Sequence, residues 1–147
     1  MDIKEVFISR DFNNEKEFQK YLIDNVELWC KDFFGSEVKD VKEQWYLNKF
    51  NKKFGSNKPR IDICLNTRDG KRIGIEVKNP KQCFCELSRS ISQLLAYGIL
   101  AENNGVPFSD LVIIVSRFDD ILLQIIKRFN LPIRVFIVNR RYHAELV

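Results

Sequence analysis

The sequence lacks any hydrophobic run close to the ~20 residues that a membrane-spanning helix needs. Its first five residues also lack the basic-then-apolar layout of a signal peptide. We therefore expect an intracellular, cytoplasmic protein with no membrane partner. There is no repeat, low-complexity segment or linker, and 147 residues suit a single domain spanning 1–147.

Histidine and cysteine are scarce. The one histidine, His143, lies in a tail without pattern, where a surface residue is a commoner finding than a catalyst. Cys30, Cys64, Cys83 and Cys85 contain a C-x-C pair but not the C-x2-C spacing of most zinc and iron–sulfur sites. The cysteines are therefore expected to be small buried or partly exposed thiols in a reducing cytosol. A metal site built from all four is the weaker alternative.

Neither sign of charge dominates the chain. Its 24 basic and 20 acidic residues give a net charge of +4, and 45% of the residues are hydrophobic. This composition is typical of a folded globular domain rather than a disordered chain. The small positive excess permits binding to a polyanion without demonstrating it.

Residues 59–78 form the most informative stretch, because two alternating patterns flank an Asp69-Gly70 turn and predict a β-hairpin. The apolar positions of the two strands are Ile61, Ile63, Leu65, Ile73, Ile75 and Val77. Side chains in a strand alternate between faces, so Asp62, Glu76 and Lys78 fall on the polar face. Pairing of the strands would bring two carboxylates and a lysine together.

The rest of the chain predicts an α/β fold with a mixed sheet flanked by helices. We expect helices at 13–30, 86–102 and 119–130, and further strands at 41–48, 111–115 and 133–138. The unit from 111 to 138 is expected to be a right-handed parallel crossover.

The expected inward faces follow from the same periodicities. For the helices they comprise Phe18, Tyr21, Leu22, Val26 and Trp29; Leu87, Ile91, Leu94, Leu95 and Ile99; and Ile121, Leu122, Ile125, Ile126 and Phe129. In the strand 41–48, Val41, Glu43, Trp45 and Leu47 are expected to share one side.

A basic, turn-rich segment at 49–60 precedes the hairpin. Its cationic residues include Lys52, Lys53, Lys58 and Arg60. Such a segment is either a solvated loop or an arm that contacts the phosphates of a nucleic acid.

The polar face of the hairpin suits phosphodiester hydrolysis. Asp62 and Glu76 offer the oxygen ligands that Mg²⁺ prefers, and the carbonyl of Val77 is a candidate third ligand. Lys78 would orient or deprotonate the attacking water and neutralise developing charge. Two carboxylates on one patch repel each other unless a cation lies between them.

The motif Pro59-x-x-Asp62, followed after thirteen residues by Glu76-Val77-Lys78, resembles the PD-(D/E)xK nuclease superfamily. This superfamily includes restriction endonucleases, archaeal Holliday-junction resolvases and RecB-type exonucleases. The resemblance covers about residues 13–138 and implies an α-β-β-β-α-β core with an additional helix and strand. It departs from the pattern in one respect, because two residues separate Pro59 from Asp62 and the PD dipeptide is absent.

The resemblance implies that Asp62 and Glu76 hold Mg²⁺, with Mn²⁺ able to substitute, and that Lys78 is the catalytic lysine. It also implies a metal-site glutamate from the first helix, for which Glu15 fits and Glu17 is the other candidate. A first-turn acid that stabilises the helix dipole is an equally good explanation of either residue.

The second helix resembles the RecB-type Q-x-x-x-Y signature through Gln93 and Tyr97, which are four residues apart and share a helix face. The resemblance implies that Gln93 braces the site or contacts substrate and that Tyr97 lies at the nucleic acid. A solvated helix face is the alternative.

The resulting hypothesis is a Mg²⁺-dependent deoxyribonuclease, with RNA not excluded as a substrate. The alternative is a catalytically silent nucleic-acid-binding module of the same fold. A homodimer is a further possibility, because Trp29, Trp45 and twelve phenylalanines are more aromatics than one core requires.

Overall fold

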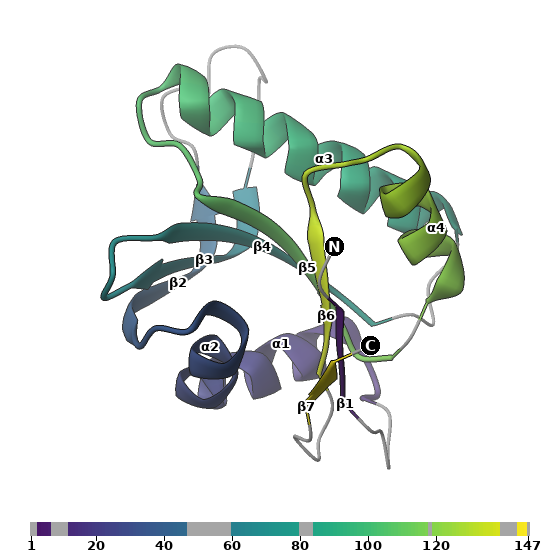
Figure 1. Ribbon diagram of the computed structural model, residues 1–147, viewed down its shortest axis with the longest axis horizontal. Helices are drawn as coiled ribbons and strands as arrows, with labels where there is room; N and C mark the ends of the chain where they lie inside the picture. The colour runs from purple at the N-terminus through teal and green to yellow at the C-terminus, as the bar shows by residue number, and fades with distance from the viewer. Residues whose placement is uncertain are drawn as a thin grey trace.

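The computed structural model describes residues 3–6, 12–46, 60–79, 84–117, 119–138 and 144–146. Within these ranges the chain forms one seven-stranded sheet with helices on both faces (Figure 1). The strands are β1 (Ile3–Val6), β2 (Val38–Tyr46), β3 (Arg60–Thr67), β4 (Arg72–Lys78), β5 (Asp110–Val115), β6 (Arg134–Ile137) and β7 (Ala144–Leu146). The helices are α1 (Glu15–Asp24), α2 (Val26–Phe34), α3 (Phe84–Asn103) and α4 (Asp120–Arg128).

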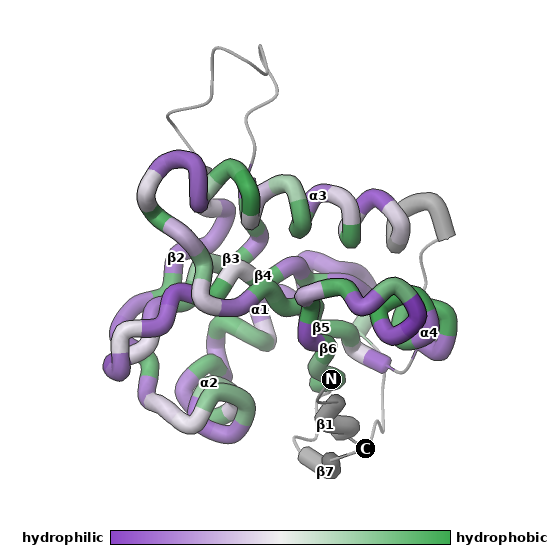
Figure 2. Tube along the Cα trace, turned by 45° about the horizontal axis from the view of Figure 1, so that its top comes forward, coloured by the Kyte–Doolittle hydropathy of each residue, from purple (hydrophilic) through white to green (hydrophobic). Residues whose placement is uncertain are grey.

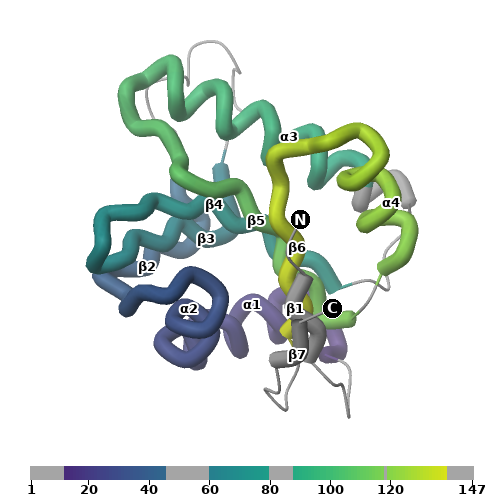
Figure 3. Tube along the Cα trace, viewed as in Figure 1, coloured from purple at the N-terminus to yellow at the C-terminus, as the bar shows by residue number. Residues whose placement is uncertain are grey.

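The sheet is mixed, as the sequence predicts. Its strand order is β2-β3-β4-β5-β6-β1-β7. The pairs β2–β3 and β3–β4 are antiparallel, the pairs β4–β5, β5–β6 and β6–β1 are parallel, and β7 is antiparallel to β1. In Figure 3, which is coloured by residue number, β2–β4 are blue and teal and β5 and β6 are green and yellow. The strands β1 and β7, which extend the sheet beyond β6, were not predicted, because each is too short to show a pattern.

The two helical layers bury separate cores. Helices α1 and α2 cover one face of the sheet and α3 and α4 cover the other (Figure 1). The first core joins Phe18, Leu22 and Trp29 to the inward residues of the hairpin, including Ile63 and Ile75. The second core lies between β5, β6 and the helices α3 and α4. Strands β5 and β6, which contribute to both cores, carry mainly hydrophobic residues (Figure 2). This agrees with strands buried on both faces.

The predicted helix 13–30 is two helices, because the chain breaks at Asn25. The main-chain N–H and the side-chain amide of Asn25 both donate to the carbonyl of Tyr21. Asparagine competes in this way with the next helical hydrogen bonds and so ends α1. Helix α2 then runs on to Gly35, whose φ of 67° gives the left-handed end that glycine favours. Helix α1 begins two residues after the predicted start, where Asn14 caps it and Glu15 and Glu17 lie in its first turn.

Some expected core positions on α3 and α4 are wrong. Ile91 and Leu94 are buried as expected, but Ile99 is 61% exposed. Helix α3 approaches β5 at Gly98, where an added Cβ would lie 2.8 Å from Leu111, so the next residue along the helix turns toward solvent. On α4 the buried face is rotated about the helix axis relative to the predicted inward face. The buried residues are Leu122, Leu123 and Ile126, while Ile121 and Phe129 are exposed.

Strand β2 does not keep the predicted alternation. Gln44 has a φ of 49°, in the left-handed region, and this interrupts the pleat. Val41 packs against the first core, whereas the Trp45 ring meets Phe108 edge-on at 5.8 Å. Phe108 lies against Gly74, which is on the polar face of β4. Val41 and Trp45 therefore lie on opposite faces, and the prediction that they share one is wrong. Leu47 lies outside the described residues.

The cysteines that the structure describes are free and buried. Burial raises the pKa of the Cys30 and Cys64 thiols to about 11 each, so both are neutral at physiological pH. Cys83 and the side chain of Cys85 lie outside the described residues, as does His143. No helix in the described ranges is both long and apolar enough to cross a membrane.

Candidate active site

The strands β3 and β4 part where the acidic residues lie. Their paired register runs from Asn66–Arg72 to Ile63–Ile75 and stops there. Beyond this point the N–H of Val77 donates to Oδ2 of Asp62 at 2.9 Å, so a side chain replaces the main-chain acceptor of the neighbouring strand. The N–H and C=O of one strand residue point to the same side. The carbonyl of Val77 therefore also faces β3, beside the Asp62 carboxylate.

The half-buried Asp62 and the buried Glu76 form a hydrogen-bonded pair of carboxyl groups. Glu76 is 4% exposed, and burial together with the charge of Asp62 raises its pKa to about 9. Burial also raises the pKa of Asp62, against the lowering effect of the Val77 N–H. The hydrogen bond between the two side chains raises the pKa of Glu76 and lowers that of Asp62. At neutral pH Glu76 is thus the protonated partner and donates to Asp62.

Lys78 completes the cluster, together with Glu15 from α1. Its Nζ lies 3.2 Å from Oε1 of Glu15, and both side chains are largely buried. The negative charge of Glu15 contributes to the raised pKa of Asp62, so the helix start lies near the acidic pair. Glu17 has a different contact, since its carboxylate accepts from the Asn13 N–H in the first turn of α1. The structure therefore brings Glu15, rather than Glu17, to Lys78.

Helix α3 places Tyr97 against the acidic pair from the other face of the sheet. Its pKa is raised by burial first and then by the charge of Glu76, and its hydroxyl hydrogen-bonds the main chain of Arg60. Gln93, one turn earlier on α3, is exposed. Arg60 is exposed at the start of β3. The predicted phosphate-contacting residues Lys52, Lys53 and Lys58 lie outside the described residues, as does Pro59.

Asn79 is a residue of this site that the sequence motif does not include. It follows Lys78 directly and is 3% exposed. Its Nδ2 donates to the carbonyl of Phe12 at 3.1 Å, and its Oδ1 accepts from Oγ of Ser116 at 2.6 Å. These bonds join the end of β4 to the segment leading into α1 and to the end of β5. The available signal was a polar residue after each of two adjacent parallel strands, whose carboxyl ends meet at one edge of the sheet.

Replacing Asn79 with alanine is expected to lower the free energy of unfolding by about 2 kcal/mol, because it removes two buried hydrogen bonds. For a chain of this length the midpoint of thermal unfolding should fall by about 5 °C. The matched control is Asn103→Ala at the exposed end of α3, which should change the unfolding free energy by less than about 0.5 kcal/mol. Equal thermal midpoints for the two variants would contradict the structural role of Asn79.

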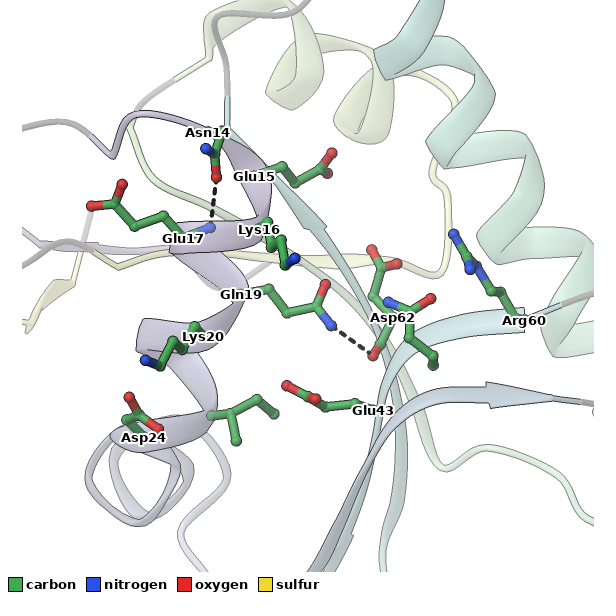
Figure 4. Close-up of a pocket in the computed structure, with 12 residues that line it drawn as sticks. Asn14, Glu15, Lys16, Glu17, Gln19, Lys20, Asp24, Glu43, Arg60 and Asp62 are labelled. Atoms are coloured by element: carbon green, nitrogen blue, oxygen red, sulfur yellow. Dashed lines mark hydrogen bonds between the residues drawn. The ribbon is translucent and has the colours of Figure 1, made fainter.

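A cleft of about 1010 Å³ opens beside Asp62, between α1 and the strands β2 and β3 (Figure 4). Its lining residues are Asn14, Glu15, Lys16, Glu17, Gln19, Lys20, Ile23, Asp24, Glu43, Gln44, Arg60 and Asp62. Gln19 reaches across from α1 and donates from Nε2 to the main-chain carbonyl of Asp62 at 3.4 Å (Figure 4). The cleft is therefore bounded by Asp62, one member of the carboxyl pair.

The oxygen atoms of Asp62 and Glu76 and the carbonyl of Val77 suit a hard divalent cation. Across the described ranges, no three His, Cys, Asp or Glu side chains are grouped closely enough to hold an ion by themselves. Mg²⁺ usually keeps several waters and takes one or two carboxylates, so two acids and one carbonyl fit it. They do not fit a closed zinc site, which needs four protein ligands.

The fold is similar to that of a solved repair endonuclease from Pyrococcus abyssi. The match has a TM-score of 0.54 at 10% sequence identity and covers 89% of this chain and 50% of that one. The chain has a restriction-endonuclease-like fold. The resemblance inferred from the hairpin motif is thus confirmed for the fold.

A second solved structure, described as an EndoMS–dsDNA complex, matches this chain less well. Its TM-score is 0.49 at 12% identity, and the match covers 92% of this chain and 50% of that one. The chain thus spans half the length of both solved proteins. No family model and no curated protein matches the sequence.

Proposed function

We propose that this protein is a Mg²⁺-dependent nuclease that hydrolyses phosphodiester bonds in DNA. The observation that carries the proposal is the carboxyl pair of the half-buried Asp62 and the buried Glu76 beside Lys78, where β3 and β4 part. Strongly perturbed acids grouped beside a cleft are a feature of catalytic sites. The fold supports the same conclusion, since it is similar to that of a protein described as a repair endonuclease.

In the proposed site, Asp62 and Glu76 hold the ion and the carbonyl of Val77 is a third ligand. A bound divalent ion would polarise the phosphate and lower the pKa of a coordinated water. Glu76 carries a proton in the metal-free protein and must release it when it becomes a ligand. Asp62 meanwhile keeps its bond to the Val77 N–H, which fixes the direction of its carboxylate.

Lys78 orients the attacking water and neutralises the charge that develops on the phosphate. Its ion pair with Glu15 directs the ammonium group and holds it at the edge of the site. Glu15 therefore acts through Lys78, and is an additional metal ligand only if that ion pair opens. Gln93 and Tyr97 lie on one face of α3, from which we propose that Gln93 braces the substrate and Tyr97 stacks on or hydrogen-bonds it. Lys52, Lys53, Lys58 and Arg60 are the proposed phosphate contacts.

The test is cleavage of plasmid, linear, single-stranded and branched DNA, and of RNA, in Mg²⁺, Mn²⁺, Ca²⁺ or chelator. We expect cleavage of at least one DNA in Mg²⁺ and Mn²⁺ and none in chelator. Salt-sensitive binding with no cleavage in any metal would instead support the silent binding module. Cleavage that persists in chelator would contradict the proposed metal dependence.

We also propose that the chain is a single nuclease domain and that two copies pair into a homodimer. The tryptophans do not supply the pairing surface, since Trp29 is fully buried and Trp45 packs on Phe108. Exposed apolar residues include Leu28, Ile99, Ile121 and Phe129. Sedimentation equilibrium should give twice the 17.4 kDa chain mass, and a monomer at all concentrations would contradict the pairing.

A further inference from the structure

Gln44 has an unusual backbone for its position in a strand. Its φ of 49° is left-handed, a conformation that side chains with a Cβ disfavour. Among the described non-glycine residues, Asn130 shares this feature, but asparagine tolerates it far better than glutamine does. Strained residues of this kind cluster where a protein binds a ligand or catalyses a reaction.

The strain changes where the Gln44 side chain goes. Successive residues of a regular strand point to opposite faces of the sheet. Glu43 and Gln44 nevertheless both line the cleft beside Asp62. The left-handed backbone therefore directs the Gln44 amide into the cleft. In a regular strand it would point to the opposite face of the sheet from Glu43.

The amide oxygen of Gln44 is buried there and accepts no hydrogen bond from any part of the chain that the structure describes. A buried carbonyl oxygen without a donor costs stability, and such groups are rare in folded proteins. An acceptor held by a strained backbone in a cleft is suited to a ligand that brings an N–H donor.

The cleft also restricts the charge of that ligand. Five carboxyl side chains and three cationic side chains line it, so a string of phosphates is disfavoured inside. A neutral, flat group with polar edges is not disfavoured by these charges. The volume of about 1010 Å³ lies at the upper end of the range for small-molecule sites, and Ile23 gives the wall an apolar surface. Gln19 connects this space directly to the main chain of Asp62.

We propose that the cleft takes an unpaired nucleobase beside the scissile phosphate, and that Gln44 is a specificity residue that accepts a hydrogen bond from its exocyclic amino group. Adenine fits best, because a glutamine amide can bond its N6 amino group and N7 together. A base can enter such a cleft only after it leaves the duplex stack, so the substrate class is single-stranded or splayed DNA. This inference rests on the proposed nuclease function and adds the substrate class to it.

The test compares oligothymidylates that contain one adenine with the same strands containing hypoxanthine, which replaces the amino group with a carbonyl. Binding is measured by fluorescence anisotropy in Ca²⁺, and cleavage is measured separately in Mg²⁺. The parent should bind the adenine strand about tenfold more tightly than the hypoxanthine strand. Gln44→Met and Gln44→Gly should bind the two strands equally.

The matched control is Gln124→Met on α4, a similar change at an exposed residue on the other side of the sheet, which should keep the tenfold preference. Gln44→Gly also separates recognition from folding, because glycine accepts a left-handed φ without strain. Its thermal midpoint should be no lower than that of the parent, whereas a purely structural role for Gln44 would lower it.

Equal binding of the two strands by the parent, or a preference that survives both Gln44 variants, would overturn the inference. The two assays keep it distinct from the nuclease proposal. Adenine preference in binding with no cleavage in Mg²⁺ refutes the nuclease and leaves the base cleft supported. Cleavage without adenine preference refutes the base cleft and leaves the nuclease supported.

Discussion

Replacing Asp62 with asparagine is expected to lower the rate of Mg²⁺-dependent DNA cleavage by on the order of 1,000-fold. Asparagine retains an oxygen that can accept the Val77 N–H, so the junction between β3 and β4 should stay intact. The variant loses the negative charge that attracts the ion. Single-turnover cleavage, together with calorimetric titration of Mg²⁺, measures both effects.

The control for this prediction is Asp120→Asn, which removes the same charge from the exposed first turn of α4. Its cleavage rate should stay within about twofold of the parent rate, as for other exposed residues remote from the site. Circular dichroism should show that both variants fold. If Asp62→Asn cleaves at the rate of Asp120→Asn, the carboxyl pair is not the metal site.

Replacing Glu76 with glutamine is expected to abolish cleavage and, at the same time, to stabilise the metal-free protein at pH 7. The glutamine amide can still donate a hydrogen bond to Asp62, but no longer carries a proton that the unfolded chain would release. The gain should be on the order of 2 kcal/mol, or about 5 °C in the thermal midpoint. Urea titration in chelator measures the free energy of unfolding directly.

The sign of the pH dependence is fixed by the raised pKa of Glu76, which lies at about 9 in the folded protein against 4.5 for the ordinary group. The stabilising contribution of the protonated carboxyl is fully present below about pH 4.5 and is lost as pH rises toward 9. Parent and Glu76→Gln should thus have similar stability at pH 4.5 and diverge at pH 7 and 9. A Glu76→Gln variant that is less stable than the parent at pH 7 would contradict the protonated pair.

Most of the fold could be predicted from the sequence, because its elements carry regular periodicities and clear turn residues. The hairpin, the buried strands β5 and β6 and the helices between them follow from apolar spacing. Two errors arose where the backbone departs from regular helix or strand geometry. Asn25 ends a helix that the apolar stripe continues through, and Gln44 reverses the alternation of β2. Neither effect appears in hydrophobic spacing.

The candidate site was predictable in its residue types but not in its contacts. Alternation was enough to place Asp62, Glu76 and Lys78 on one face. It could not show that Glu76 is buried and protonated, because that depends on α3 covering the polar face of the hairpin. The partners Gln19 and Asn79 come from segments far from the motif, and only tertiary packing brings them to it.

The parting of β3 and β4 also gives the protein a built-in spectroscopic reporter. The Val77 amide proton is bonded to a side-chain carboxylate, whereas the neighbouring amides of β4 are bonded within the sheet. Its ¹H and ¹⁵N chemical shifts should therefore follow the charge on Asp62, in titrations with acid and with Mg²⁺ alike. A single backbone resonance would then follow metal binding in the intact protein, without a probe attached near the site.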